Sequence, residues 1–76
     1  MRNIDDNLLS MYKIKIDYIG SLDDLLIETE LPKIPTKGEN IGFWHGENWV
    51  IAEVDEVVFE LDKDNKYLVA EINVHD

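Results

Sequence analysis

Hydrophobic and polar residues alternate with a period of two along most of the chain after residue 10. This period is typical of β-strands that bury one face, so the pattern predicts an all-β protein. The first strand is expected over residues 11–18, before Gly20-Ser21 interrupts the alternation. A second is expected over residues 25–31, unless Asp23-Asp24 caps a short helical turn there.

Three further strands are predicted in the second half of the chain. They are expected over residues 40–44, 49–61 and 67–74, with a charged turn at 62–66. Pro32 and Pro35 lack the backbone donors that a central strand needs, so the segment around them is expected to be a connecting arm or an edge. Gly38 is expected at a turn. The hydrophobic positions change parity at Asp55-Glu56, which predicts a β-bulge that lets one long strand bend.

These elements predict five antiparallel strands, rolled into a compact barrel or a strongly curved sheet. The 76 residues allow a single domain, which we expect over residues 11–76. Residues 1–10 differ in composition and are expected to form an N-terminal appendage, either disordered or with a short helical turn through Leu8-Leu9. The chain has no cysteine, so apolar packing or a partner chain must stabilise its small core.

A tryptophan hairpin is predicted in the middle of the chain. If Gly46-Glu47 is a two-residue loop of type II′, which prefers Gly at its first position, Trp44 lies opposite Trp49 and both indoles share a face. The other face is apolar throughout and is therefore expected to be the core. It carries Ile41, Phe43, Val50, Ala52 and Val54. A shift of the loop by one residue would exchange the two faces.

The outer face of this hairpin is the predicted partner-binding site, because the centres of protein interfaces are rich in Trp and Tyr. Its residues are Trp44, Trp49, Ile51, Glu53 and Asp55. The alternative is a structural role, in which the N-terminal segment or the proline arm of the same chain covers the tryptophans.

The charge of the chain restricts the class of partner. Seventeen acidic and seven basic residues give a formal net charge of -10, which opposes binding to phosphate backbones and to anionic lipid surfaces. We therefore expect no nucleic-acid partner and no membrane partner. The carboxylates serve solubility, or they mimic a nucleic-acid backbone and occupy the basic groove of another protein.

No motif in the sequence points to catalysis or to a cofactor. His45 and His75 each have one carboxylate nearby in the sequence, which supplies two ligands where a structural zinc site needs four. The charged turn begins like a calcium loop but has Lys66 and Tyr67 at its fifth and sixth positions, and the sixth requires Gly. There is no thiol nucleophile and no serine in a nucleophile elbow, so we expect no enzyme activity, no metal and no cofactor.

The sequence also bears on cellular location. The N-terminus lacks the uninterrupted apolar region of a signal peptide, and no window approaches the roughly 18 apolar residues of a membrane span. The absence of cysteine fits a reducing compartment without demanding one. We therefore expect the protein in the cytoplasm.

The proline arm and the strand after the hairpin carry a family resemblance. Residues 31–41 read Leu-Pro-Lys-Ile-Pro-Thr-Lys-Gly-Glu-Asn-Ile, and residues 49–54 read Trp-Val-Ile-Ala-Glu-Val. This layout resembles that of small uncharacterised bacterial and phage-type proteins, which are similar to SH3-like β-barrels. The resemblance covers residues 12–74 in outline and implies a five-stranded SH3-like barrel with no activity to transfer. The aromatic candidates for an SH3-type peptide groove are Tyr12, Tyr18, Trp44, Trp49 and Tyr67.

Taken together, the sequence predicts a small acidic protein-interaction module without enzyme activity. We expect it to bind a protein partner or a second copy of itself, with a homodimer favoured because a small open barrel leaves edge strands that invite pairing. One alternative is an acidic mimic or inhibitor of a basic nucleic-acid-binding protein. The other is a small hydrolase or metal enzyme, which requires a concave site with converging polar groups.

Overall fold

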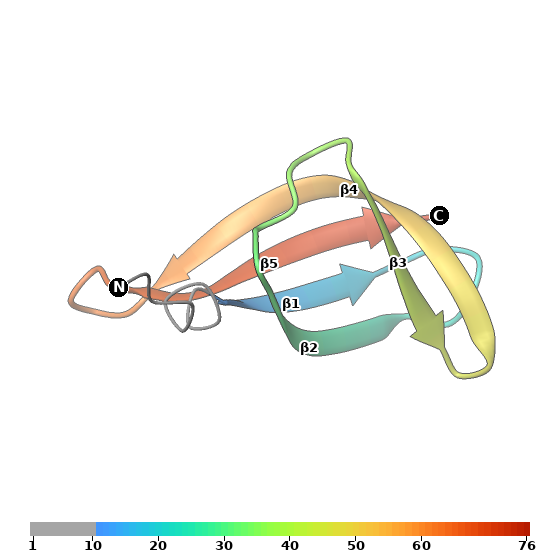
Figure 1. Cartoon of the computed structure of the whole chain (residues 1–76), viewed down its shortest axis with the longest axis horizontal. Helices are drawn as coiled ribbons and strands as arrows, with labels where there is room; N and C mark the ends of the chain where they lie inside the picture. Colours follow the sequence, from blue (N-terminus) through green and yellow to red (C-terminus); the bar gives the residue numbers. More distant parts are fainter. Residues whose placement is uncertain (1–10) are drawn as a thin grey trace, which may run out of the picture.

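The computed structural model describes residues 11–76 and contains five strands and no helix in that range (Figure 1). The strands are β1 (Tyr12–Tyr18), β2 (Leu25–Leu31), β3 (Asn40–His45), β4 (Asn48–Leu61) and β5 (Tyr67–His75). These bounds confirm the strands that the alternating pattern predicts. The expected appendage, residues 1–10, lies outside the described residues. Within the described range, no helix has the length and hydropathy that crossing a membrane requires.

The five strands form one sheet in the order β2-β1-β5-β4-β3, and this sheet curls strongly into a half-barrel (Figure 1). The prediction of antiparallel strands throughout is wrong for one pair, because β1 and β5 run parallel. The other neighbouring pairs are antiparallel. Parallel neighbours need a long crossover connection, and here β2, β3 and β4 together provide it. Alternation within a strand determines its faces and says nothing about the direction of its neighbour.

The core lies on the inner face of the curl. Its buried side chains are Ile14, Ile16, Tyr18, Phe43, Val50, Ala52, Val54, Ala70, Ile72 and Val74. Ile16 and Ile72 are neighbours across β1 and β5, and Val54 and Val74 are neighbours across β4 and β5. Burying a side chain of this size stabilises the fold by roughly 1.5–3 kcal/mol, so these positions select the inner face of each strand.

Strand β4 extends along both halves of the molecule, pairing with β3 in its first half and with β5 in its second. The register shifts between Val54 and Glu56, which confirms the predicted bulge at Asp55. Beyond the bulge, Phe59 and Leu61 point to the same side as the core, yet they are 56% and 51% exposed. Among the described residues, the proline arm reaches Phe59, with which Ile34 and Pro35 line an open hollow, but it does not bury that side chain.

The proline arm connects β2 to β3 without forming a strand. Pro35 is buried, and Ile34 packs partly against the core. The Gly38 amide donates to the Val54 carbonyl over 2.8 Å, and the Val54 amide donates to the Glu39 carbonyl over 2.8 Å. Gly38 has a φ of 93°, which confirms the turn expected there. The arm therefore fixes the start of β3 against β4, next to the bulge.

Candidate protein-binding site

The β3–β4 hairpin closes in the predicted register, with Trp44 opposite Trp49. Its loop consists of Gly46 and Glu47. Gly46 has a φ of 63°, whereas Glu47 does not adopt a positive φ. A positive φ at the first loop position alone is the type II′ pattern, whose twist matches that of the flanking strands. This loop geometry determines which face each hairpin residue occupies.

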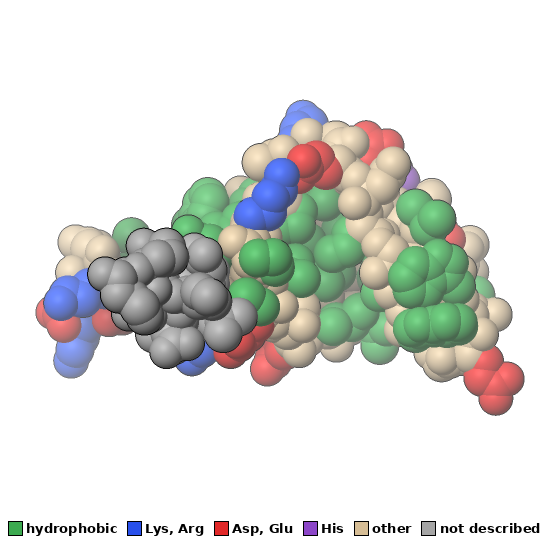
Figure 2. All heavy atoms as spheres, viewed as in Figure 1, with side chains coloured by type: hydrophobic (Ala, Val, Ile, Leu, Met, Phe, Trp, Pro, Cys, Tyr) green, Lys and Arg blue, Asp and Glu red, His purple; other side chains and the backbone are tan. Residues whose placement is uncertain are grey.

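The two tryptophans lie side by side on the outer face of the sheet. Their ring centroids are 5.3 Å apart and their planes are inclined by 62°, an edge-to-face contact. Trp44 is 63% exposed, Trp49 54% and the neighbouring Ile51 60%. Figure 2 shows hydrophobic side chains gathered over this hairpin, at the right-hand end of the view. The proline arm therefore does not cover the tryptophans, and the other proposed cover, the N-terminal segment, lies outside the described residues.

Gly42 provides the space in which the Trp49 indole lies. Gly42 pairs with Ile51, one outer-face position along the hairpin from the tryptophan pair. A Cβ at Gly42 would lie 2.4 Å from Cζ2 of Trp49, closer than non-bonded atoms approach. The indole therefore extends across β3 and covers its backbone at the edge of the sheet. Sequence reasoning assigned no role to Gly42, although its outer-face position two residues before Trp44 was the available signal.

The other two predicted site residues, Glu53 and Asp55, lie beyond Ile51 on the same outer face. Glu53 is the neighbour of His75 across β4 and β5. Nδ1 of His75 donates to Oδ2 of Asp55 over 2.7 Å. This hydrogen bond, together with the charge of Asp55, raises the pKa of the His75 imidazole. All five predicted residues thus lie on the outer face of the hairpin, which has an aromatic end and an acidic end.

The hairpin contributes negative charge and no lysine or arginine. Between Lys37 and Lys63 the chain contains neither residue type. The carboxylates in that stretch are Glu39, Glu47, Glu53, Asp55, Glu56, Glu60 and Asp62. Two of them have lysine partners from elsewhere: Lys33 lies 3.2 Å from Glu39, and Lys15 lies 3.9 Å from Glu60. The tryptophan face is therefore set in a region of negative potential.

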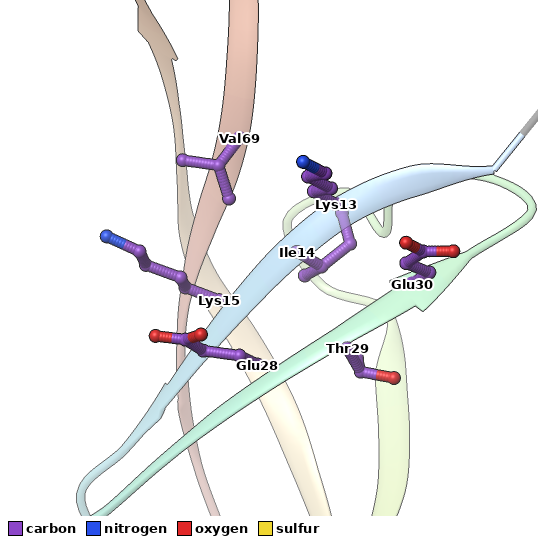
Figure 3. A pocket seen from close by; sticks show the side chains of 7 residues that line it. All are labelled: Lys13, Ile14, Lys15, Glu28, Thr29, Glu30 and Val69. Carbon is purple, nitrogen blue, oxygen red and sulfur yellow. The ribbon is translucent and has the colours of Figure 1, made fainter.

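The outer face of β1 and β2, at the other end of the strand order, carries positive and negative side chains in balance, as Figure 3 shows. Lys13 lies opposite Glu30 and Lys15 opposite Glu28 across β1 and β2. With Val69 from β5 these side chains line an open hollow of about 380 Å³. Because the two signs alternate, the hollow presents no field of a single sign to a charged ligand. It is therefore a weaker candidate site than the hairpin.

The remaining aromatic residues do not extend the tryptophan face into an SH3-type groove. Tyr18 is buried in the core, where its ring contacts those of Phe43 and His45. Tyr12 and Tyr67 form a separate edge-to-face pair, with centroids 6.1 Å apart. The candidate aromatics are thus divided among three places in the described molecule.

The groups considered for metal binding make structural contacts instead. Nε2 of His45 donates to the Asp23 carbonyl over 2.7 Å, which ties the hairpin to the loop between β1 and β2. Oδ1 of Asp62 accepts the amides of Asp64 and Lys66 and so closes the charged turn. In residues 11–76, no three side chains of His, Asp or Glu come close enough to hold a metal ion.

One polar cluster was not predicted from the sequence. Oδ2 of Asp76 accepts the Ser21 hydroxyl over 2.6 Å and the Tyr18 hydroxyl over 3.0 Å, while Oδ1 accepts the Ser21 amide. These hydrogen bonds, those from Ser21 above all, lower the pKa of Asp76. The contact joins residues 55 or more positions apart, and no local pattern predicts such a pairing.

Comparison with known proteins adds no assignment: no family model, no curated protein and no solved structure matches this chain. The fold and site instead define a structural class, an all-β half-barrel that exposes a tryptophan pair on its edge hairpin.

Proposed function

We propose that this protein is a protein-binding module and that the outer face of its β3–β4 hairpin is the contact surface. The observation that carries the proposal is the exposed tryptophan pair. Trp44 and Trp49 contact each other on the face opposite the core, and each residue is more than half exposed. Trp is among the residues most enriched at the energetic centres of protein interfaces. An interaction module makes use of this exposure, whereas folding of the monomer does not require it.

The size of the face fits the centre of a small interface. Trp44, Trp49 and Ile51 together expose about 400 Å² of apolar surface, estimated from the typical areas of such side chains. A patch of that size is often functional on a monomeric protein. A standard interface buries about 800 Å² on each partner, so the rest of the hairpin must contribute the polar rim.

The partner in this proposal is another protein or a second copy of the chain, with the cytoplasm as the compartment. The similarity to SH3-like barrels stays a prediction.

The mimic alternative differs from this proposal in one measurable respect. Binding through carboxylates that mimic a nucleic acid should survive removal of the tryptophans.

The test compares the tryptophan pair with Phe43, which precedes Trp44 and lies on the opposite face of β3. In the double variant Trp44→Ala/Trp49→Ala, we expect the free energy of unfolding to fall by about 1 kcal/mol, the scale of an exposed cross-strand pair. Phe43→Ala serves as the matched control, because Phe43 is buried and its truncation should cost about 3–5 kcal/mol. Urea unfolding followed by far-UV circular dichroism gives both values.

Sedimentation equilibrium on the same proteins separates the two kinds of partner. A dimeric wild type and a folded, monomeric tryptophan variant would identify the face as a self-association surface. A monomeric wild type would leave the face for a different protein. If the tryptophan variant is destabilised as strongly as Phe43→Ala, the pair is structural and the proposal should be abandoned.

A further inference from the structure

Among the described residues, β3 is an edge strand that has β4 on one side and no strand on the other. The two-residue loop makes His45 and Asn48 a hydrogen-bonded pair, so the next pair, Trp44 and Trp49, is a non-hydrogen-bonded one. By the same alternation, the amide and carbonyl groups of Asn40, Gly42 and Trp44 point away from β4. Within residues 11–76, the backbone of β3 pairs with β4 alone, and the hydrogen bond from His45 to the Asp23 carbonyl is made by the side chain.

This edge lacks the features that usually prevent strand addition. Exposed edges are normally protected by charged side chains, prolines or bulges. Strand β3 contains no lysine, arginine, aspartate, glutamate or proline, and its register with β4 is regular from Asn40 to His45. The opposite edge, β2, carries Glu28 and Glu30 on its outer side. Strand β3 is therefore the unprotected edge of the sheet, and the Trp49 indole extends over it.

The charge around this edge determines which strand it would accept. A second copy would bring its own Glu47 and Glu53 towards the same carboxylates, and each chain has a net charge of -10. A basic segment would instead be attracted to them. Its arginine or lysine side chains could also contact the exposed faces of the indoles, since cations bind favourably to the electron-rich face of Trp.

We propose that an extended, basic segment of another protein adds to β3 as a sixth strand and places cationic side chains against Trp44 and Trp49. This inference rests on the proposed function and specifies its partner. An added strand lies about 4.8 Å from β3, so a residue opposite Gly42 meets the Trp49 ring that covers that glycine. Alternate residues on one face are about 7 Å apart, which brings the next cation beside Asn40 and its neighbour Glu53.

The probe is a synthetic seven-residue peptide that alternates arginine and valine, and its control is the same peptide with glutamine in place of arginine. Each is titrated into the ¹⁵N-labelled protein and followed by NMR. We expect the arginine peptide to bind at least about tenfold more tightly. The shifts should include the indole N–H signals of both tryptophans, and the Gly42 and Trp44 amides should become protected from hydrogen exchange.

Two pairs of variants distinguish strand addition from general attraction to an acidic protein. Asn40→Pro removes an outward amide from the edge, whereas Asn40→Ala keeps it, so only the proline variant should lose affinity. Glu47→Gln/Glu53→Gln removes two charges from the hairpin, and Glu28→Gln/Glu30→Gln removes two from β2. Affinity should fall severalfold more in the hairpin variant than in its β2 control.

The outcomes separate this inference from the proposed function. Equal binding of the two peptides, shifts centred on β1 and β2, or no shift at about 1 mM arginine peptide would each overturn the basic-strand inference. If the peptide fails but the wild type dimerises through its tryptophans, the hairpin remains the contact surface and only the partner is wrong. If the tryptophans prove structural, both proposals fail.

Discussion

At the scale of single residues, Gly42 determines the form of the tryptophan face. In Gly42→Ala the new Cβ would overlap Cζ2 of Trp49, and we expect the exposed indole to swing away from β3 and lose its contact with Trp44. The backbone at Gly42 has no positive φ, so alanine should change the free energy of unfolding by less than about 1 kcal/mol.

Circular dichroism detects this displacement, because two coupled indoles give an exciton couplet that separated indoles lack. The couplet should be lost in Gly42→Ala and kept in Ile51→Ala, which truncates the cross-strand neighbour of Gly42. An unchanged couplet in the Gly42 variant would show that the Trp49 ring does not depend on the glycine.

The His75–Asp55 pair predicts a dependence on pH at the acidic end of the face. The hydrogen bond to Asp55 raises the pKa of His75 in the folded state. The pair therefore contributes stability below the ordinary imidazole pKa, about 6.5, and that contribution is lost as the pH rises through the raised value. We expect an NMR titration of His75 to give a pKa above the ordinary value.

Two variants test the cause of that shift. In Asp55→Asn the pKa of His75 should return towards its ordinary value, whereas Glu56→Gln, which removes a neighbouring charge outside the pair, should have a smaller effect. The loss of stability caused by Asp55→Asn should be larger at about pH 5.5 than at about pH 8.5. An equal loss at both values would mean that Asp55 stabilises the bulge rather than the imidazolium.

At the scale of elements, the hairpin depends on the conformation of its first loop residue. Gly46 has a φ of 63°, and an added Cβ would meet no atom within 4 Å. The cost of Gly46→Ala should therefore be conformational, about 1–2 kcal/mol in the free energy of unfolding. Glu47→Ala, in the same loop but without a positive φ, should be nearly neutral. Equal urea midpoints for the two variants would contradict the type II′ assignment.

The strands and the hairpin register were predictable because their signals are local. The period of two, the parity change at Asp55 and the preference of Gly46 for a positive φ each involve residues that are close in sequence. The same information placed Trp44 and Trp49 on the outer face. The same alternation puts Phe59 and Leu61 on one face beyond the bulge, but it could not show that the rest of the sheet leaves both residues exposed.

At the scale of the whole molecule, the order of the strands was beyond sequence reasoning. Whether β5 inserts between β1 and β4, and in which direction it runs, depends on contacts between residues more than 50 positions apart. The contact of Asp76 with Ser21 is of the same kind. Alternation is satisfied equally well by a parallel and by an antiparallel neighbour, so the free energy that selects between them arises only in the assembled core.

The net charge of -10 predicts how salt affects the stability of the whole molecule. The described residues extend over 47 × 31 × 21 Å. At about 0.01 M salt the Debye length is about 30 Å and most carboxylates repel one another, whereas at about 0.1 M it is about 10 Å and only neighbours do. Folding brings these charges together, so we expect the urea midpoint to rise between the two salt concentrations. A falling midpoint would mean that pairs such as Lys33–Glu39 and Lys15–Glu60 contribute more than the net repulsion.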